Sequence, residues 1–415
     1  MSIQKNLIFS FALFLLLGCQ SSILNKVKPS EVGLSSEKLN KVNEVVNNLV
    51  AQKRLAGASV MIARGGKVCF FETYGKMDLE KNKEMNKDTI FRIYSMSKAI
   101  TSAAVMQLVE QGKIDLHAPV KNYIPEFVNL KVWNNGNPQA AKQDLTTAHL
   151  LTHTSGTPYG AGGEYGKLLK QAKIMNKEND LKGMVSQMAS VPLAFEPGSD
   201  WAYGTSIDVL GYLVEMVSKQ KFDDYLKEHI FEPLKMVDTG FYVPASKLDR
   251  FAANYNSNGK GKLSLKDAPE NSRYLKNPKL LSGGGGLVST ISDYMKFLLC
   301  IRNGGVLNGE RILKPATVKL MINNQVSKEA GWVKFGKQVR DGIGYGYGFS
   351  VTEKLSKFAP DRKVGDYGWG GAASTHYWVS PEDDLIVITM EQTMPYSFML
   401  ETALKSIISE SVIRK

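Results

Sequence analysis

Residues 89–108 read Thr89-Ile-Phe-Arg-Ile-Tyr94-Ser95-Met96-Ser97-Lys98-Ala-Ile-Thr-Ser-Ala-Ala-Val-Met-Gln-Leu108. β-Branched and aromatic residues dominate positions 89–94, which indicates a strand, and the apolar spacing over 98–111 is typical of a helix. Because positions i and i+3 share one helix face, the amine of Lys98 can reach the Ser95 hydroxyl. Ser-x-x-Lys spacing recurs elsewhere in the chain, so it leaves two interpretations open: a nucleophile with an adjacent base, or a helix cap beside a surface lysine.

The composition is that of an ordinary globular protein. The chain has 415 residues, of which 43% are hydrophobic and 22% are charged. This excludes a disordered or collagen-like chain, and the length suggests two or three domains. The net charge is +12, but no block of five like charges occurs. We therefore interpret the surplus as solvated surface lysine and expect no nucleic-acid partner.

The amino terminus has the features of a bacterial export signal. Lys5 precedes a mostly apolar run at residues 7–17, which is shorter than the roughly 20 residues of a membrane span but suits a signal peptide. The following Leu16-Leu17-Gly18-Cys19 resembles a lipobox, in which Cys19 is lipidated. An ordinary cleaved signal is the alternative. We expect a lipid anchor in a bacterial membrane and a location in the cell envelope, at the outer membrane or in the periplasm.

Strand and helix patterns predict how the chain is organised. Runs at residues 58–63 and 67–74 flank Gly65-Gly66 and indicate a hairpin. Helical spacing follows over 98–111, 146–152, 181–188, 207–219 and 222–232, and again over 292–302 and 315–322. Strand patterns return at 346–351, 375–379 and 385–391, before a final helix. This order predicts an α/β (α+β) fold, with an antiparallel sheet built from both chain ends, flanked by helices, and a mostly helical inserted domain.

The domain boundaries that we predict follow from these patterns. Residues 1–18 form the lipoprotein signal peptide and 19–33 a tether. Residues 34–94 and 281–415 form the discontinuous sheet domain, and 95–280 the mostly helical domain. The glycine-, lysine- and asparagine-rich insertions at 156–177 and 254–278 are expected to be surface rims.

Searches for other chemistry return no convincing motif. The five histidines show no His-Glu-x-x-His pattern, and the chain has no Gly-x-Ser-x-Gly elbow. We therefore expect no catalytic metal and no cofactor.

Three elements, in the order expected of one family, favour the nucleophile interpretation of Ser95. The first is Ser95-Met96-Ser97-Lys98, the second contains Tyr203-Gly-Thr205, and the third is Gly368-Trp369-Gly370-Gly371. Together they resemble the serine β-lactamase and penicillin-binding-protein superfamily, in its class C-like branch, and within it the family VIII carboxylesterases. The resemblance runs from about residue 34 to the final helix and implies a β-lactamase/transpeptidase-like fold.

The resemblance also implies roles for individual residues. Ser95 is the acylated nucleophile, Lys98 assists its deprotonation, and Tyr203 is the general base that later protonates the leaving group. The backbone N–H groups of Ser95 and Ala372 form the oxyanion hole, and Trp369, Gly370 and Gly371 contact the substrate. The pair His149 and His153 is interpreted as structural.

Two departures from the β-lactamase pattern favour an esterase. Thr205 replaces an asparagine that binds an acylamino side chain, and Trp369-Gly370-Gly371 replaces Lys-Thr-Gly. Losing that lysine removes a cation for a substrate carboxylate, worth ~1.5–3 kcal/mol, whereas tryptophan offers an apolar wall.

The expected activity is that of a serine hydrolase acting on a small-molecule ester or amide, with small carboxylic esters preferred. A β-lactamase or D-amino-acid peptidase is the alternative within the superfamily. A non-catalytic cell-envelope protein that binds peptides is the alternative from another class. The oligomeric state is left open by the sequence.

Overall fold

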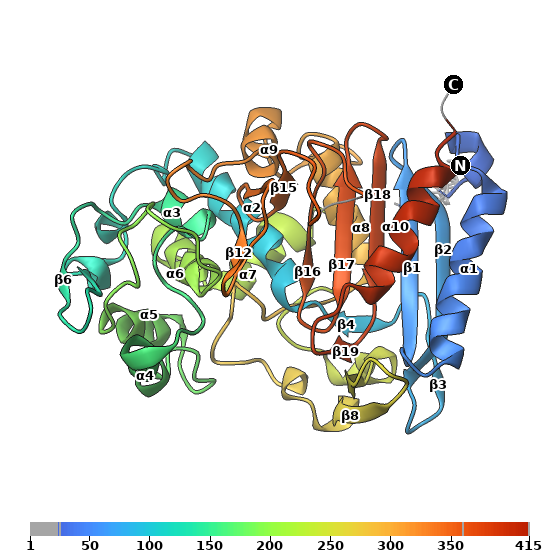
Figure 1. The fold of residues 1–415 in the computed structure, drawn as a ribbon, viewed down its shortest axis with the longest axis horizontal. Coiled ribbons are helices and arrows are strands. Elements are labelled where there is room, and N and C mark those ends of the chain that lie inside the picture. The colour runs from blue at the N-terminus through green and yellow to red at the C-terminus, as the bar shows by residue number, and fades with distance from the viewer. Residues whose placement is uncertain (1–23, 25, 359–360, 414–415) are drawn as a thin grey trace, which may run out of the picture.

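The computed structural model describes Leu24, residues 26–358 and residues 361–413. Its centre is an antiparallel sheet of eight strands in the order β14-β15-β16-β17-β18-β1-β2-β3 (Figure 1). In that order the strands span Ile343–Tyr345, Ser350–Thr352, Tyr367–Gly371, Thr375–Ser380, Leu385–Met390, Gly57–Arg64, Lys67–Asp78 and Lys83–Glu84. The predicted lipidation residue, Cys19, lies outside the described residues.

Both chain ends build this sheet, as the sequence predicts. The early hairpin of β1 and β2 turns at Gly65-Gly66, where both residues have positive φ (60° and 73°). This backbone conformation, which matches the twist of the flanking strands, favours glycine. β1 then pairs with the late strand β18, with Ser59 opposite Met390. The antiparallel α/β fold class is therefore confirmed.

Helices cover both faces of the sheet because its strands are apolar on both sides. Val60 and Ile62 of β1 belong to one hydrophobic cluster, and Met61 and Ala63 belong to another. The first cluster is closed by α1 (Ser36–Ala51) and α10 (Met399–Ser411), which pack side by side (Figure 1). The second is closed in part by α8 (Ile291–Arg302), which packs on β18 and β1.

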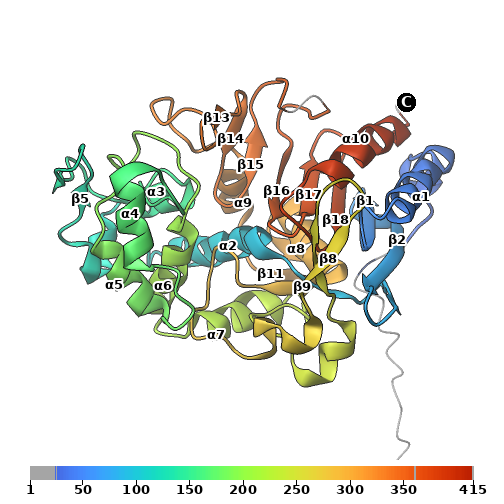
Figure 2. The same cartoon turned by 60° about the horizontal axis from the view of Figure 1, so that its bottom comes forward.

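Between the chain ends lies a mostly helical region. Its helices are α2 (Ser97–Glu110), α3 (Thr147–Leu151), α4 (Gly163–Ala172), α5 (Leu181–Ala189), α6 (Ser206–Ser218) and α7 (Phe222–Leu226), which continues as a π-helical turn over Lys227–Phe231. α2 is buried on nearly every side, packs against α6, and lies between the other helices and the sheet (Figure 2). The remaining helix, α9 (Pro315–Ile322), packs on α2.

Short strand pairs complete the described structure. They are β4 (Ile90–Arg92) with β9 (Val288–Thr290), β5 (Lys131–Val132) with β6 (Gln139–Ala140), β10 (Val306–Leu307) with β11 (Glu310–Arg311), and β12 (Lys334–Phe335) with β13 (Gln338–Val339). Among the helices described, none is long and apolar enough to cross a membrane.

The structure corrects one expected strand and gives order to both insertions. The pattern over 346–351 predicts one strand, but residues 346–349 form the turn between β14 and β15. Gly348 has a φ of +94°, which the turn requires and a strand would not. The insertion at 156–177 contains α4, and that at 254–278 contains β7 (Asn254–Ser257) and β8 (Leu263–Asp267), which form a small sheet with β19 (Thr393–Met394). The predicted domain boundary at 280 stays a prediction.

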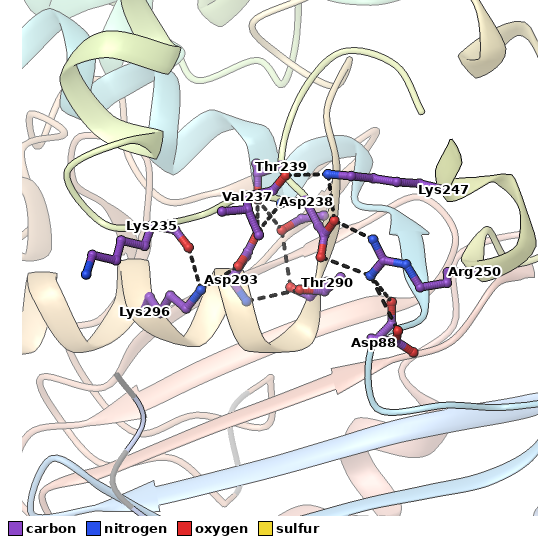
Figure 3. A network of polar contacts seen from close by, with 11 residues as sticks. Asp88, Lys235, Val237, Asp238, Thr239, Lys247, Arg250, Thr290, Asp293 and Lys296 are labelled. Carbon is purple, nitrogen blue, oxygen red and sulfur yellow. Dashed lines mark hydrogen bonds and ion pairs between the residues drawn. The ribbon is translucent and has the colours of Figure 1, made fainter. Parts of the chain in front are cut away.

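A polar network joins the start of α8 to residues 238–250, which lie earlier in the chain (Figure 3). The backbone N–H of Asp238 donates to Asp293 Oδ2 at 2.7 Å, and Arg250 and Lys247 contact the Asp238 carboxylate at 2.6 and 2.8 Å. Burial alone would raise the pKa of Asp238, but the hydrogen bonds from Arg250 and Lys247 lower it overall. The Asp238 carboxylate therefore stays ionised, and its contacts connect residues 238–250 to α8.

Candidate active site

Ser95 lies in a short 3-10 turn, Tyr94–Met96, that leads directly into α2. Tyr94 has a φ of +40°, a conformation that costs a non-glycine residue of order 1–3 kcal/mol. The turn is held by Ser97, whose hydroxyl donates to the Tyr94 carbonyl at 2.6 Å and accepts from the Leu287 N–H at 3.2 Å. The position of Ser95 is thus enforced by its neighbours. Sequence reasoning assigns no role to Ser97.

Lys98 and Tyr203 both contact Ser95. The ammonium of Lys98 donates to Ser95 Oγ at 3.2 Å, and the Tyr203 hydroxyl donates to the same oxygen at 2.6 Å. The Lys98 side chain is fully buried, and its Nζ lies 4.6 Å from the centre of the Tyr203 ring. The structure therefore brings together the three residues that the resemblance selects.

Two further residues accept hydrogen bonds from the Lys98 ammonium and a third holds those two in place; the sequence assigns a role to none of them. Lys98 Nζ donates to the Gly284 carbonyl at 2.6 Å and to the Tyr159 hydroxyl at 3.4 Å. The buried Asp208 carboxylate accepts from the Gly284 N–H at 3.0 Å and from the Tyr159 hydroxyl at 3.3 Å. All three donors of the ammonium are thus used, which a buried cation needs.

The sequence signals for these three residues are weak. Asp208 follows the second motif, Gly284 lies within a run of four glycines, and Tyr159 lies in an insertion. A Cβ at position 284 would lie 2.6 Å from Asp208 Oδ2. Glycine at 284 is therefore required by the close approach of its backbone to Asp208.

The third motif forms strand β16 and approaches the Ser95 turn. A Cβ at position 371 would lie 2.3 Å from the Ile93 carbonyl oxygen, and one at position 370 would lie 2.5 Å from the Tyr396 hydroxyl. Only glycine allows both approaches. Ala372 follows directly and lines the same cavity as Ser95. The predicted oxyanion role of the Ala372 N–H is compatible with this placement and stays a prediction.

His149 and His153 make structural contacts. His149 caps α3, where its Nδ1 accepts from the Thr146 N–H at 3.3 Å. His153 is fully buried among aromatic rings, with its centroid 5.0 Å from that of Tyr203 and 5.6 Å from that of Trp201. Burial lowers the pKa of His153 well below its ordinary value, and the charge of Lys98 adds to this effect. A neutral His153 packs behind Tyr203 and supports its ring.

A cavity of about 650 Å³ opens in front of Ser95. One wall is aromatic: the Trp369 centroid lies 5.5 Å from that of Tyr203 and 6.1 Å from that of Phe335. The Thr205 hydroxyl donates to the Thr157 carbonyl at 3.3 Å and Thr205 does not line this cavity, so it does not substitute for the missing asparagine. The cavity suits an apolar acyl or alcohol group. Among the described residues, no group of three or more His, Cys, Asp or Glu side chains is arranged to hold a metal ion.

Residues 42–407 match the family described as Beta-lactamase, and the chain belongs to this family of beta-lactamase-fold hydrolases. It is 30% identical over 373 residues to Esterase EstB of Burkholderia gladioli, covering 85% of this chain and 90% of EstB.

Solved structures agree in fold. EstCE1, described as a hydrolase with promiscuous acyltransferase activity, superposes with a TM-score of 0.78 at 26% identity, over 90% of this chain and 99% of EstCE1. The simvastatin synthase LovD of Aspergillus terreus matches with a TM-score of 0.74 at 20% identity, over 90% and 98% of the two chains, which shows the shared fold alone.

Proposed function

We propose that this protein is a serine hydrolase that cleaves small carboxylic esters through an acyl-Ser95 intermediate. The observation that carries the proposal is the convergence on one oxygen, Ser95 Oγ, of the Tyr203 hydroxyl at 2.6 Å and the Lys98 ammonium at 3.2 Å. The similarity to an esterase, EstB, at 30% identity supports the choice of substrate.

The proposed reaction has two stages. Tyr203, as phenolate, takes the proton of Ser95 while Oγ attacks the ester carbonyl carbon. The Ser95 and Ala372 N–H groups stabilise the resulting oxyanion, each worth about 10²–10³ in rate. The C–O bond to the alcohol then breaks, and Tyr203 returns the proton to the alkoxide. Water, deprotonated by Tyr203, then attacks the acyl carbon; the C–Oγ bond breaks, the acid is released, and Tyr203 returns the proton to Ser95 Oγ.

Lys98 supports this chemistry without forming a bond. A free tyrosine has a pKa near 10, so a phenolate base at neutral pH needs a cation beside it. The fully buried ammonium supplies that charge in surroundings with little water to screen it. Positioned proton transfer of this kind contributes typically ~10²–10⁴ in rate.

The cleft supports esters over β-lactams. Trp369 stands where β-lactamases carry a lysine, and Thr205 bonds to backbone in place of offering an amide to the cleft. The β-lactamase or D-amino-acid peptidase activity remains the competing assignment, and peptide binding without catalysis is the competitor from another class.

A direct comparison of substrates and variants tests the proposal. The purified protein is given p-nitrophenyl butyrate and a chromogenic cephalosporin, and intact mass is measured during turnover. We expect a higher kcat/KM for the ester and a butyryl adduct on Ser95. Ser95→Ala should abolish both, and Ser264→Ala, at an exposed position on β8, should change neither.

Two outcomes would overturn this assignment in different ways. A higher kcat/KM for the cephalosporin would make the protein a β-lactamase. An unmodified Ser95, which also fails to react with a fluorophosphonate, would favour the non-catalytic binding protein.

Lipid anchoring through Cys19 is a separate proposal, supported by the apolar run and the Leu16-Leu17-Gly18-Cys19 motif. Acyl chains contribute about 0.8 kcal/mol for each methylene that a bilayer buries. In bacterial cells, the protein should take up radiolabelled palmitate and sediment with membranes. Cys19→Ser should lose both properties and Ser21→Ala should keep them; equal behaviour of the two variants would rule the anchor out.

A further inference from the structure

The cavity in front of Ser95 is apolar near the nucleophile and charged elsewhere. Four cationic and two acidic side chains line it. They come from separate parts of the chain: Arg340 follows β13, Arg362 precedes β16, and Glu401 and Lys405 belong to α10. The remaining pair, Lys357 and Asp361, carries opposite charges. Cations therefore outnumber anions on the cavity wall.

Glu401 already has cationic partners. Its Oε1 lies 2.9 Å from Lys405 Nζ and 3.6 Å from Arg362 Nη2, and its Oε2 lies 3.8 Å from His376 Nε2. Burial alone would raise the pKa of Glu401, but the charges of Lys405, His376 and Arg362 lower it to about 2. The single carboxylate of Glu401 thus forms ion pairs with two cations, Lys405 and Arg362.

Among the residues that the structure describes, Arg340 forms no ion pair, although Tyr396 and Glu401 lie near enough to raise its pKa against the effect of burial. Its guanidinium lies over the rings of Phe335 and Phe398, 4.6 and 5.0 Å from their centres. Its Nε is buried and forms no hydrogen bond within the described part of the chain. Burial lowers the pKa of Arg340, but a guanidinium stays protonated in proteins. Arg340 is half-buried, and a partly desolvated charge without an ion pair is incompletely compensated, so an anionic ligand would stabilise it.

The surroundings of Arg340 suit a carboxylate. The aromatic rings lie over the face of the guanidinium, so a planar, two-oxygen partner would meet its terminal N–H groups at the edge. Arg362 lies close enough to affect the pKa of Arg340 and lines the same cavity. Between these cations and Ser95, Phe335 and Trp369 offer an apolar wall for the linking carbons.

We infer that Arg340, with Arg362, forms an anion subsite that binds a carboxylate carried by one arm of the ester substrate. The preferred substrates are then monoesters in which a short apolar spacer separates the scissile ester from a free carboxylate. This inference rests on the proposed function and narrows it.

Matched pairs of chromogenic esters test the subsite. Each p-nitrophenyl monoester of a dicarboxylic acid (glutaric, adipic or suberic) is compared with the neutral ester of equal chain length (pentanoate, hexanoate or octanoate). The readout is the ratio of kcat/KM for the charged ester to that for the neutral ester. For the spacer that fits, the ratio should exceed ten and fall as salt is added.

Variants identify the residue responsible. Arg340→Gln should lower this ratio about tenfold or more, and Arg340→Lys, which keeps the positive charge, should retain part of it. Lys337→Gln is the matched control, because Lys337 lies exposed in the turn of the same β12–β13 hairpin and does not line the cavity. It should leave the ratio unchanged.

A second set of esters locates the arm. The butyrate ester of 4-hydroxyphenylacetate carries a free carboxylate on the alcohol side of the scissile ester. The same compound with its carboxylate methylated is the neutral comparison. An Arg340-dependent preference in either set supports the subsite and assigns the arm. If Arg340→Gln changes the ratio in neither set, the subsite is refuted although the esterase proposal stands. If neutral esters do not acylate Ser95, the proposed function itself fails.

Discussion

The Tyr203 hydroxyl lies 2.6 Å from Ser95 Oγ, although 108 positions separate the two residues. Tyr203 is placed by ring contacts, with Trp201 stacked at 6.2 Å and Trp369 tilted at 5.5 Å between centroids. These contacts hold the ring whether or not its hydroxyl is present. At the scale of one residue, the hydroxyl can therefore be removed without moving the ring.

Replacing Tyr203 by phenylalanine separates chemistry from packing. Tyr203→Phe should lower kcat for a neutral ester by about 10²–10⁴, with little change in KM, because the general base is lost while the wall of the cavity remains. Steady-state kinetics and a thermal melt check this. A variant that unfolds at the wild-type temperature and keeps more than a tenth of the activity would contradict the role of Tyr203 as base.

Strand β16 shows how one element serves both the sheet and the site. Its ladder with β17 continues to Gly371, which pairs with Thr375. Its far end reaches the Ser95 turn so closely that a Cβ at 371 would meet the Ile93 carbonyl oxygen at 2.3 Å. The glycines of the third motif thus permit this approach, in addition to any contact with substrate.

Adding one methyl group to this strand should disturb both sheet and site. Gly371→Ala should lower the free energy of unfolding by about 1–3 kcal/mol, as overpacking does, and should lower kcat/KM at least tenfold because Ser95 and Ala372 are pushed apart. Gly240→Ala is the control, since a Cβ there meets nothing closer than 3.9 Å. Chemical denaturation and ester kinetics measure both effects; equal behaviour of the two variants would contradict the close approach.

At the scale of the whole molecule, buried polar groups connect distant parts of the chain. Arg92 of β4 contacts Asp267 at 2.8 Å, the Ala252 carbonyl at 2.6 Å and Gln392 at 3.2 Å. Glu391, which directly precedes Gln392 and follows the last residue of β18, is fully buried. Burial raises the pKa of Glu391 to about 8. Folding therefore keeps this carboxyl protonated at neutral pH.

The buried Glu391 should make stability depend on pH. In the unfolded chain a glutamate ionises near pH 4.3, whereas in the folded chain it stays neutral to about pH 8. The unfolded state is favoured as pH rises between these values, by up to about 1.4 kcal/mol per unit. Glu391→Gln cannot ionise, so its gain in melting temperature over wild type should grow from pH 5 to pH 8.

An exposed glutamate provides the comparison for this experiment. Glu353→Gln, at the surface after β15, should show the same difference from wild type at both pH values. A Glu391→Gln variant whose difference from wild type is independent of pH would mean that the carboxylate is ionised in the folded protein.

Local sequence patterns were sufficient to predict most of the helices and strands. Helix α9 spans Pro315–Ile322, as its apolar spacing predicts, and the Gly65-Gly66 hairpin forms as predicted. Such elements depend on residues a few positions apart, which sequence periodicity records. The expected strand over 346–351 was wrong because Gly346 and Gly348 turn the chain where it packs on other elements: a Cβ at 348 would lie 2.9 Å from Ala99 Cα of α2.

The order of strand and helix patterns in the sequence predicted that the sheet uses both chain ends, and the three-residue spacing predicted that Lys98 can reach Ser95, although Ser95 lies in the 3-10 turn before α2 and not on the helix. Tyr203 was predicted as a catalytic residue only because of the family resemblance. Only the tertiary structure decided that Gly284 and Tyr159 accept from the Lys98 ammonium, that Asp208 holds both of them, and that Arg340 lines the cavity without an ion pair among the described residues. The physical reason is that a charge is satisfied by atoms close in space, and which distant residues supply them depends on how the elements pack.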